Sequence, residues 1–353
     1  MHADKYAYPR CGLALEAASS SLACPTCGDV ARPDGKVVDF STKDLYWSYI
    51  ARPAMSRMVE TARREGLDAA LDETFTHYEN RDFYRRIMNE SRGDFRFLLP
   101  VGRQSAVLDL GSGWGATTLA LARQFAHVTA CDGTKENLEF LACRARAAEL
   151  NNMSFVRIDP LEGARLPFQD GSFAAVILNG VLEWIGTGSM EGSPEELQRQ
   201  LLLEVRRVLQ PGGCVYVAIE NRFYALYWLG KIEPHTMLPF VSVLPRAVAN
   251  RISLAVRGRP FRNYTPSYGS LNSLVRKAGF DRLEFYLPLP SYQHPEVILP
   301  IEGGNCLRYW VKHLLIPRRF LHRVYAAGLL LMDWLGILKF LASDFVLVAR
   351  RQA

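Results

Sequence analysis

The 353-residue sequence lacks the long apolar segments from which membrane spans are built. Near its C-terminus the longest charge-free apolar stretch, Val324 to Met332, has nine residues, whereas a bilayer-spanning helix needs about 20. The first residues also lack the basic and then apolar layout of a signal peptide. These absences argue against a transmembrane protein. They predict a cytoplasmic location, with peripheral contact at the inner face of the membrane as a further option.

Cysteine is scarce and unevenly placed, with seven residues in the chain. An odd number without regular spacing argues against the disulfide framework of small secreted domains, so we expect a reducing compartment. A long basic run is missing as well. Basic patches with aromatic residues suit nucleic acid, but without a long basic run or a visible single-strand-binding module we do not expect nucleic acid as a partner.

The modest net charge of +6 is concentrated in two parts of the chain. Residues 221–262 contain seven Arg or Lys and the single acid Glu233, and residues 305–353 contain eight Arg or Lys and two acids. Each part therefore carries +6, with aromatic residues interspersed. We expect both to be additions to one main domain, because the chain is about 100 residues longer than a typical domain.

Residues 106–120, AVLDLGSGWGATTLA, are the stretch around which the rest of the chain is organised. An apolar run, glycines at Gly111, Gly113 and Gly115, and an apolar repeat with helical spacing predict a strand, a tight turn and a helix. Glycine adopts positive φ and lets the backbone approach a ligand that a Cβ would block. The following helix points its N-terminal amides at the same place.

A carboxylate follows the next apolar run. This residue, Asp132, lies 21 positions after Gly111, where an acid at the end of the second strand can accept hydrogen bonds from both ribose hydroxyls. The turn and the acid together predict a nucleoside site. The glycines alone leave a dinucleotide open, because Gly111, Gly113 and Ala116 also match G-x-G-x-x-G/A. Against this, Asp109 stands where an NAD site usually has an apolar residue.

Two further segments decide between these cofactors: residues 166–173 read LPFQDGSF, and residues 209–220 read LQPGGCVYVAIE. With the glycine turn and Asp132 in the same order, they resemble the class I S-adenosylmethionine-dependent methyltransferases over roughly residues 91–285 and the extreme C-terminus. The resemblance implies S-adenosyl-L-methionine as the cofactor. It places the cofactor-binding residues at Asp109, Gly111, Ser112, Gly113, Trp114, Asp132, Gly133, Asp159 and Asn179.

The strand pattern and the resemblance predict an α/β fold, a Rossmann-like doubly wound sheet of about seven strands with the last strand antiparallel. With helices between them, strands are expected near residues 106–110, 128–132, 154–158, 174–179, 214–219, 282–287 and 344–348. We expect a knuckle at 1–44 and a helical linker or cap at 45–100. The methyltransferase domain would then occupy 101–353, with helical lid insertions at 221–264 and 288–343.

The N-terminal segment is similar to the zinc-ribbon-like knuckles that precede some bacterial methyltransferases. Those domains carry two CxxC pairs, but here Tyr8 stands in place of one cysteine, so that Cys11, Cys24 and Cys27 remain. A tetrahedral structural zinc needs four ligands, and His2 is the conceivable fourth. A structural zinc site and a degenerate knuckle without metal both stay open.

Three residues are candidates for catalysis. His235 lies in the insertion at 221–264, which we interpret as a lid, and its imidazole titrates near neutral pH. Glu220 ends the fifth strand, where polar groups face the ligand crevice of an open sheet. Glu183 follows the fourth strand, near the expected methyl donor. For His235 and Glu183, an ordinary structural role is the alternative.

The lid with its HTMLP segment, and LPSYQHP after strand six, resemble bacterial methyltransferases associated with glycan or polysaccharide assembly. We therefore predict O- or N-methylation of a small-molecule, sugar or glycan acceptor. Methylation of tRNA or protein is an alternative. Another is a non-catalytic scaffold that binds S-adenosylmethionine, which Tyr8 favours, as does Ala174, where the family usually has an acid.

Overall fold

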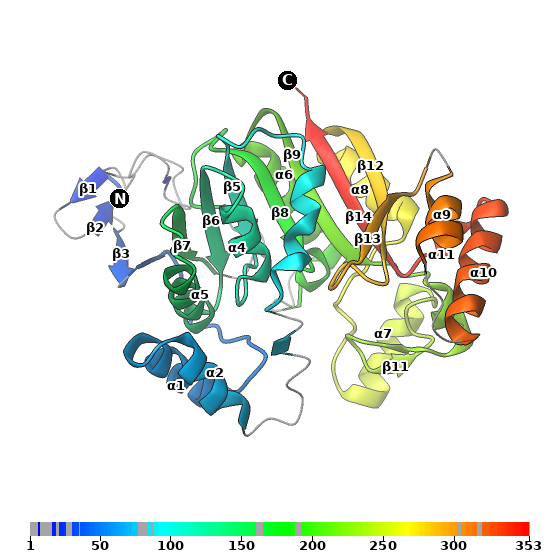
Figure 1. Ribbon diagram of the computed structural model, residues 1–353, viewed down its shortest axis with the longest axis horizontal. Coiled ribbons are helices and arrows are strands. Elements are labelled where there is room, and N and C mark those ends of the chain that lie inside the picture. Colours follow the sequence, from blue (N-terminus) through cyan, green and yellow to red (C-terminus); the bar gives the residue numbers. More distant parts are fainter. Residues whose placement is uncertain are drawn as a thin grey trace.

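The computed structural model describes residues 6–7, 16–18, 21–25, 30–34, 36–76, 84–85, 88–159, 165–187, 192–302, 305–315 and 320–352. These residues form one sheet of twelve strands with helices on both faces, and a separate two-stranded sheet (Figure 1). The strand order of the large sheet is β1-β2-β3-β4-β7-β6-β5-β8-β9-β14-β12-β13. The chain therefore has the α/β, Rossmann-like architecture that the sequence predicts.

Five parallel strands form the centre of the sheet, each where the sequence predicts a strand. They are β5 (Ala106–Leu110), β6 (His127–Asp132), β7 (Met153–Arg157), β8 (Phe173–Asn179) and β9 (Leu209–Glu220). Residues 107–110 and 173–178 are buried, because helices cover both faces of a parallel sheet. All five strands end at the same edge of the sheet, which is where open α/β sheets bind ligands.

Antiparallel strands complete one side of the sheet. β14 (Asp344–Arg351) lies between β9 and β12 (Phe280–Leu289), and β13 (Val297–Pro300) forms the edge. The last strand of the chain is antiparallel to both neighbours, as predicted. The insertion at 288–343 separates β12 from β14 in the sequence but not in the sheet.

Four short strands near the N-terminus extend the other side of the sheet: β1 (Glu16–Ala18), β2 (Ser21–Ala23), β3 (Val30–Asp34) and β4 (Val37–Asp39). β4 pairs in parallel with β7, with Val37 opposite Phe155. The expected number of about seven strands is therefore wrong. The physical reason is that β7 would otherwise expose an unpaired edge, and β4 covers it.

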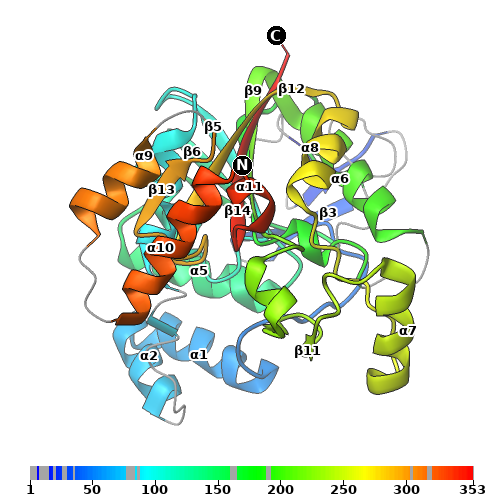
Figure 2. The ribbon, with the colours of Figure 1, turned by 90° about the vertical axis from the view of Figure 1, so that its right-hand side faces the viewer.

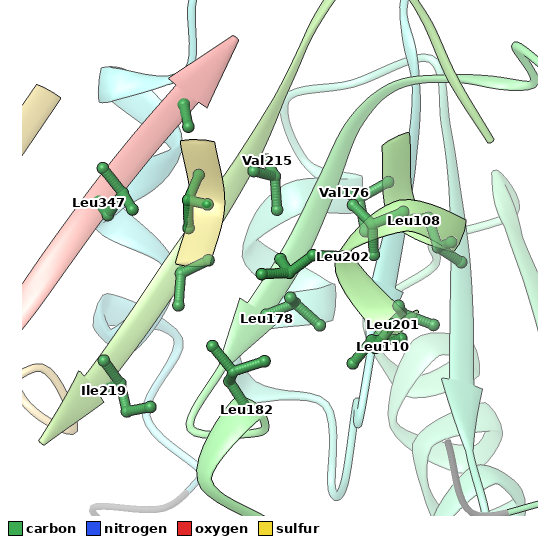
Figure 3. Close-up of a cluster of buried hydrophobic side chains, with 14 of the residues drawn as sticks. Leu108, Leu110, Val176, Leu178, Leu182, Leu201, Leu202, Val215, Ile219 and Leu347 are labelled. Carbon is green, nitrogen blue, oxygen red and sulfur yellow. The ribbon is translucent and has the colours of Figure 1, made fainter. Parts of the chain in front are cut away.

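Helices cover both faces of the sheet. α4 (Ala116–Ala122), α5 (Lys135–Ala147) and the 3₁₀ helix η2 (Glu90–Leu98) pack on one face, and α6 (Pro194–Val208) and α8 (Tyr268–Lys277) pack on the other (Figure 1). Leu201 and Leu202 of α6 lie among apolar side chains of the central strands, including Leu108 and Leu178 (Figure 3). Burial of this apolar surface stabilises the fold and holds the strand ends in place.

Additional elements surround the carboxyl ends of the parallel strands. α1 (Arg52–Arg64) and α2 (Leu67–Thr76) pack against α5. The insertion after β9 contains η4 (Ala225–Leu229), β10 (Ile232–Glu233), β11 (Leu238–Pro239) and α7 (Arg246–Arg257). Figure 2 shows β11 and α7 at the same end of the molecule as α1 and α2.

Among the described residues, the second insertion adds helices near the β12–β13 edge (Figure 1). They are α9 (Cys306–Tyr309), the π-helix η5 (Trp310–Leu314), α10 (Phe320–Trp334) and α11 (Leu338–Leu341). The two insertions meet at Asn221, whose side-chain amide donates to the carbonyls of Phe340 and Ala342 at 2.9 and 2.8 Å. Within the described ranges, none of the helices combines the length and the apolar character that crossing a membrane requires.

Candidate active site

The loop between β5 and α4 has the backbone conformations that its glycines predict. Gly111, Gly113 and Gly115 have φ angles of 72°, 51° and 82°, a region in which other residues are strained. A Cβ at Gly111 would lie 2.6 Å from Cγ2 of Val181, and one at Gly115 would overlap Leu141. A Cβ at Gly113 would meet nothing within 4 Å. The loop thus packs closely at two glycines and leaves open space beside the third.

Asp132, at the end of β6, is tied to this glycine loop. Its Oδ2 accepts a hydrogen bond from the Gly113 amide at 2.8 Å, and its Oδ1 accepts bonds from the Thr134 amide at 2.8 Å and from Asn137 Nδ2 at 3.3 Å. The pKa of this carboxyl is raised, because burial outweighs these donors. The backbone amide of Gly133 also donates to this carboxyl, and the contact of Asp132 with the ribose hydroxyls of a cofactor stays a prediction.

Two buried polar atoms near the loop have no hydrogen-bond partner in the described part of the chain. They are Oγ of Ser112, in the loop itself, and Oδ1 of Asn179, at the end of the neighbouring strand β8. A buried polar atom without a partner costs free energy. Both atoms, and the open space at Gly113, therefore fit a site that a polar ligand such as a nucleoside cofactor completes.

Asp109 is buried in β5 beside the same loop. Its Oδ2 accepts hydrogen bonds from the hydroxyls of Thr117 and Thr118 of α4, at 3.0 and 2.6 Å. Burial raises the pKa of Asp109 to about 6, although these two hydroxyls lower it. Asp109 thus joins β5 to α4, and its contact with a cofactor amino group stays a prediction.

Three other predicted cofactor residues lie in contact with the N-terminal segment. The Trp114 indole is buried and donates to Ser48 Oγ at 3.0 Å. Both oxygens of Asp159 accept from the Thr42 amide at 2.9 Å, and Gly133 packs against the segment that precedes α1. Trp114 and Asp159 thus hold the N-terminal segment on the core, and for all three residues a cofactor contact stays a prediction.

The three candidate catalytic residues, distant in the sequence, meet near the carboxyl ends of β8 and β9. Glu183 lies in the 3₁₀ helix η3 (Leu182–Trp184), Glu220 ends β9, and His235 follows β10. One oxygen or ring nitrogen from each lies within 4.8 Å of those of the other two. We call these three residues the acidic pocket.

Burial and neighbouring charges change the proton affinities of the acidic pocket. Burial, helped by the negative charge of Glu220, raises the pKa of Glu183 well above its ordinary value. Burial lowers the pKa of His235, but its hydrogen bond to Glu233 and the charges of Glu220 and Glu233 outweigh this effect, so the net pKa is raised. Glu183 and His235 therefore both hold protons more strongly than they would in water.

Two residues that the sequence analysis missed complete the pocket. Glu233 is buried; its Oε1 lies 2.5 Å from Nδ1 of His235, and its Oε2 accepts from the amide and hydroxyl of Thr236. Tyr292 donates its hydroxyl hydrogen to Glu220 Oε1 at 2.9 Å. The position of Glu233, two residues before His235, was a usable signal. No local pattern points to Tyr292, which comes from the loop after β12.

The cysteines of the predicted knuckle are only partly described. Cys24 is buried, whereas Cys11 and Cys27 lie outside the described residues, as do His2 and Tyr8. Among the described residues, the acidic pocket is the one group of three His, Cys, Asp or Glu side chains close enough to share a metal ion. A structural zinc at the knuckle stays a prediction, which elemental analysis of the purified protein would test.

The centre of the chain matches a known family. Residues 108–217 match a model described as a methyltransferase domain. A demethylmenaquinone methyltransferase of Clavibacter sepedonicus is 28% identical over 229 residues, which cover 62% of this chain and 83% of the relative. One of Tropheryma whipplei (strain Twist) is 32% identical over 137 residues, which cover 37% of this chain and 51% of the relative.

Two solved methyltransferase structures show a partial likeness to this chain. A SAM-dependent methyltransferase from Thermotoga maritima has a TM-score of 0.44 and 16% identity, covering 80% of this chain and 98% of its own. The Haemonchus contortus phosphoethanolamine N-methyltransferase 2 in complex with S-adenosyl-L-methionine has a TM-score of 0.45 and 15% identity, covering 84% of this chain and 60% of its own.

Proposed function

We propose that this chain is a class I S-adenosylmethionine-dependent methyltransferase and that it methylates a small-molecule acceptor bound at the acidic pocket. One juxtaposition supports this proposal above all. The glycine loop and Asp132 follow β5 and β6, and the acidic pocket follows β8 and β9, which are the next strands in the sheet. A methyl donor and its acceptor would therefore lie side by side.

We propose that S-adenosyl-L-methionine lies along the glycine loop. Asp132 would accept hydrogen bonds from the ribose hydroxyls, and the unpartnered atoms of Ser112 and Asn179 would bond to other polar groups of the cofactor. The open space at Gly113 gives the ligand room to approach the backbone. When bound, the cofactor supplies a methyl group on a sulfonium sulfur.

The acidic pocket is suited to the acceptor side of the reaction. A hydroxyl or a protonated amine is a poor nucleophile until it loses a proton, and a polar group within about 3 Å can promote that loss. We propose that Glu183, Glu220 and His235 together promote it. The close packing of Gly111 against Val181, two residues before Glu183, supports this placement, because it would keep the pocket beside a methyl donor bound at the glycine loop.

The relatives support a small molecule as the acceptor. Those reported above are named demethylmenaquinone methyltransferases, so their names refer to a small quinone-type substrate. Sugar or glycan acceptors, suggested by the resemblance of the lid, form the second class to test. Methylation of tRNA or protein has no feature of the described residues in its favour beyond the basic surface of the insertions.

Methyl transfer from labelled S-adenosylmethionine tests the proposal directly. The acceptors would be a quinol, a hexose, an oligosaccharide, a small amine and total tRNA. We expect turnover with one of the small-molecule classes and at least about a hundredfold loss in Glu220→Gln, which removes a charge at the pocket without changing its volume. The exposed Glu60→Gln on α1 is the matched control. Turnover on tRNA alone would overturn the acceptor class.

A further inference from the structure

We propose that Glu183, Glu220 and His235 together bind one divalent metal cation. This inference rests on the proposed function, because it states how the acidic pocket activates its acceptor. The three side chains come from three elements, η3, β9 and the loop after β10, and one potential ligand atom from each lies within 4.8 Å of the others. Two carboxylates and an imidazole are a ligand set that suits divalent ions such as Mn²⁺ and Zn²⁺.

Both carboxylates of the pocket have an oxygen that lacks a partner. Glu183 is 1% exposed, and its Oε2 accepts no hydrogen bond from any described residue; the same is true of the buried Oε2 of Glu220. A buried carboxylate oxygen without a donor is costly. A cation shared by the two oxygens removes this cost.

Acidic side chains also outnumber basic ones around the pocket. Asp344 faces Glu220 across the β9–β14 pair and is buried, and Glu233 adds a further carboxylate. Within the described ranges, neither Lys nor Arg forms an ion pair with Glu183, Glu220 or Asp344. Lys231 is a cation that acts on this group, because its charge lowers the pKa of Asp344, and a divalent ion would balance the negative charge of the carboxylates that bind it.

The histidine is held as a metal ligand usually is. Its Nδ1 lies 2.5 Å from Glu233 Oε1, and Glu233 is fixed in turn by the Thr236 amide and hydroxyl at 2.6 and 2.7 Å. Nε2 therefore remains as the available ring nitrogen of His235. Histidine ligands commonly donate their other N–H to a carboxylate in this way, which sets the tautomer and the ring orientation.

A cation in the pocket would act on a hydroxyl acceptor. As a Lewis acid it lowers the pKa of a coordinated hydroxyl, so that the hydroxyl releases its proton to water. The acceptor oxygen then forms a bond to the methyl carbon, while the carbon–sulfur bond breaks and its electron pair stays on sulfur. The products are a methyl ether and S-adenosylhomocysteine. The acceptor class that this site selects is therefore a small molecule with a hydroxyl group able to coordinate the ion.

Manganese binding tests the inference without cofactor or acceptor. The full chain is treated with EDTA, desalted and titrated with Mn²⁺, with calorimetry and electron paramagnetic resonance as readouts. We expect one Mn²⁺ per chain, with no measurable binding in Glu183→Gln or Glu220→Gln and affinity about 10- to 100-fold lower in Glu233→Gln, which removes the charge beside His235. Glu60→Gln, an exposed acid on α1, is expected to bind like the wild type.

The outcomes separate this inference from the proposed function. Circular dichroism first shows which variants are folded. Because Glu183→Gln and Glu220→Gln are two independent ligand variants, the test still works if one of them does not fold. Absence of saturable Mn²⁺ binding, or equal binding in the folded Glu183→Gln and Glu220→Gln variants, overturns the metal site. Full methyl transfer in excess EDTA overturns its role in the reaction. S-adenosylmethionine binding to the metal-free protein is measured in parallel, and its absence would instead contradict the proposed function.

Discussion

At the scale of single residues, Asp109 is a buried acid held by hydroxyl groups. Thr117 and Thr118 both donate to its Oδ2. Burial raises its pKa to about 6, so the folded protein keeps this proton to a higher pH than the unfolded chain does. Asp109 therefore links the stability of the β5–α4 unit to pH.

We predict that the free energy of unfolding of the wild type falls as pH rises from about 4 to 6, relative to Asp109→Asn. Between these values the folded state binds more protons than the unfolded state, and stability is lost as the folded carboxyl ionises. Raising the pKa of the Asp109 carboxyl from 3.8 to about 6 corresponds to roughly 3 kcal/mol of unfolding free energy. Urea denaturation of both proteins in buffers from pH 4 to 7.5 measures this pH dependence. If the free energies of unfolding of the two proteins changed in parallel with pH, the prediction would be contradicted.

Asp132 is the acid on which cofactor binding is expected to depend most. We predict that Asp132→Ala loses two charge-assisted hydrogen bonds to the ribose, of roughly 1.5–3 kcal/mol each, so that calorimetry shows affinity for S-adenosylmethionine falling by at least about a hundredfold. The control is Asp281→Ala at the opposite edge of the sheet. Because Asp132 also binds the Gly113 amide, thermal melting accompanies the titration. Unchanged affinity in a folded variant would remove Asp132 from the site.

At the scale of elements, a buried aromatic cluster centred on Trp114 helps to attach the helices α1 and α2 to the core. Trp114, in the glycine loop, is 2% exposed and packs with residues of α1, α2 and α5. Its ring lies 5.3 Å from that of Tyr49 and 5.4 Å from that of Phe140, both edge-on. The N-terminal helices and the glycine loop are therefore expected to lose order together.

We predict that Trp114→Ala lowers the free energy of unfolding by about 3–5 kcal/mol, the usual cost of removing a large buried aromatic side chain. Trp228→Ala, at a side chain that is 55% exposed, is the control and should change it by less than about 1 kcal/mol. Denaturation and limited proteolysis are the measurements. The expected first cleavages in Trp114→Ala lie in α1 and α2. Equal stability of the two variants would show that other contacts than those of Trp114 hold α1 and α2 on the core.

At the scale of the whole molecule, the insertion after β9 exposes large apolar side chains. Leu229 is 80% exposed, Met237 65% and Phe240 47%. Met237 and Phe240 also have positive φ angles of 58° and 61°, which are strained for residues other than glycine. Residues 221–262 carry a net charge of +6. Exposed apolar side chains in a basic segment of the chain are typical of proteins that bind at a membrane surface.

We therefore predict that the protein floats with anionic vesicles at low salt, less so at high salt because screening weakens the attraction, and not with neutral vesicles. The double variant Leu229→Asp with Met237→Asp should lose this binding. Phe97→Asp, at a side chain on η2 that is 69% exposed, should keep it. If the wild type did not float at low salt, membrane binding would be contradicted, and the insertion after β9 would be interpreted only as a lid.

The sequence by itself determined the features that depend on local signals. The turn at Gly111 to Gly115 was predictable because only glycine adopts such φ angles without strain. The five central strands were predictable because they are short apolar runs bounded by turn residues. Asp132 and Glu220 could be placed at the ligand edge because they directly follow these runs.

Only the tertiary structure decided the features that depend on distant segments. Glu183, Glu220 and His235 meet because η3, β9 and the first insertion converge, and Tyr292 joins them from another loop. β4 pairs with β7 although more than a hundred residues separate them, which made the sheet larger than expected. No periodicity within a segment encodes such pairings, because they arise from which surfaces and strand edges remain to be covered once the central sheet has formed.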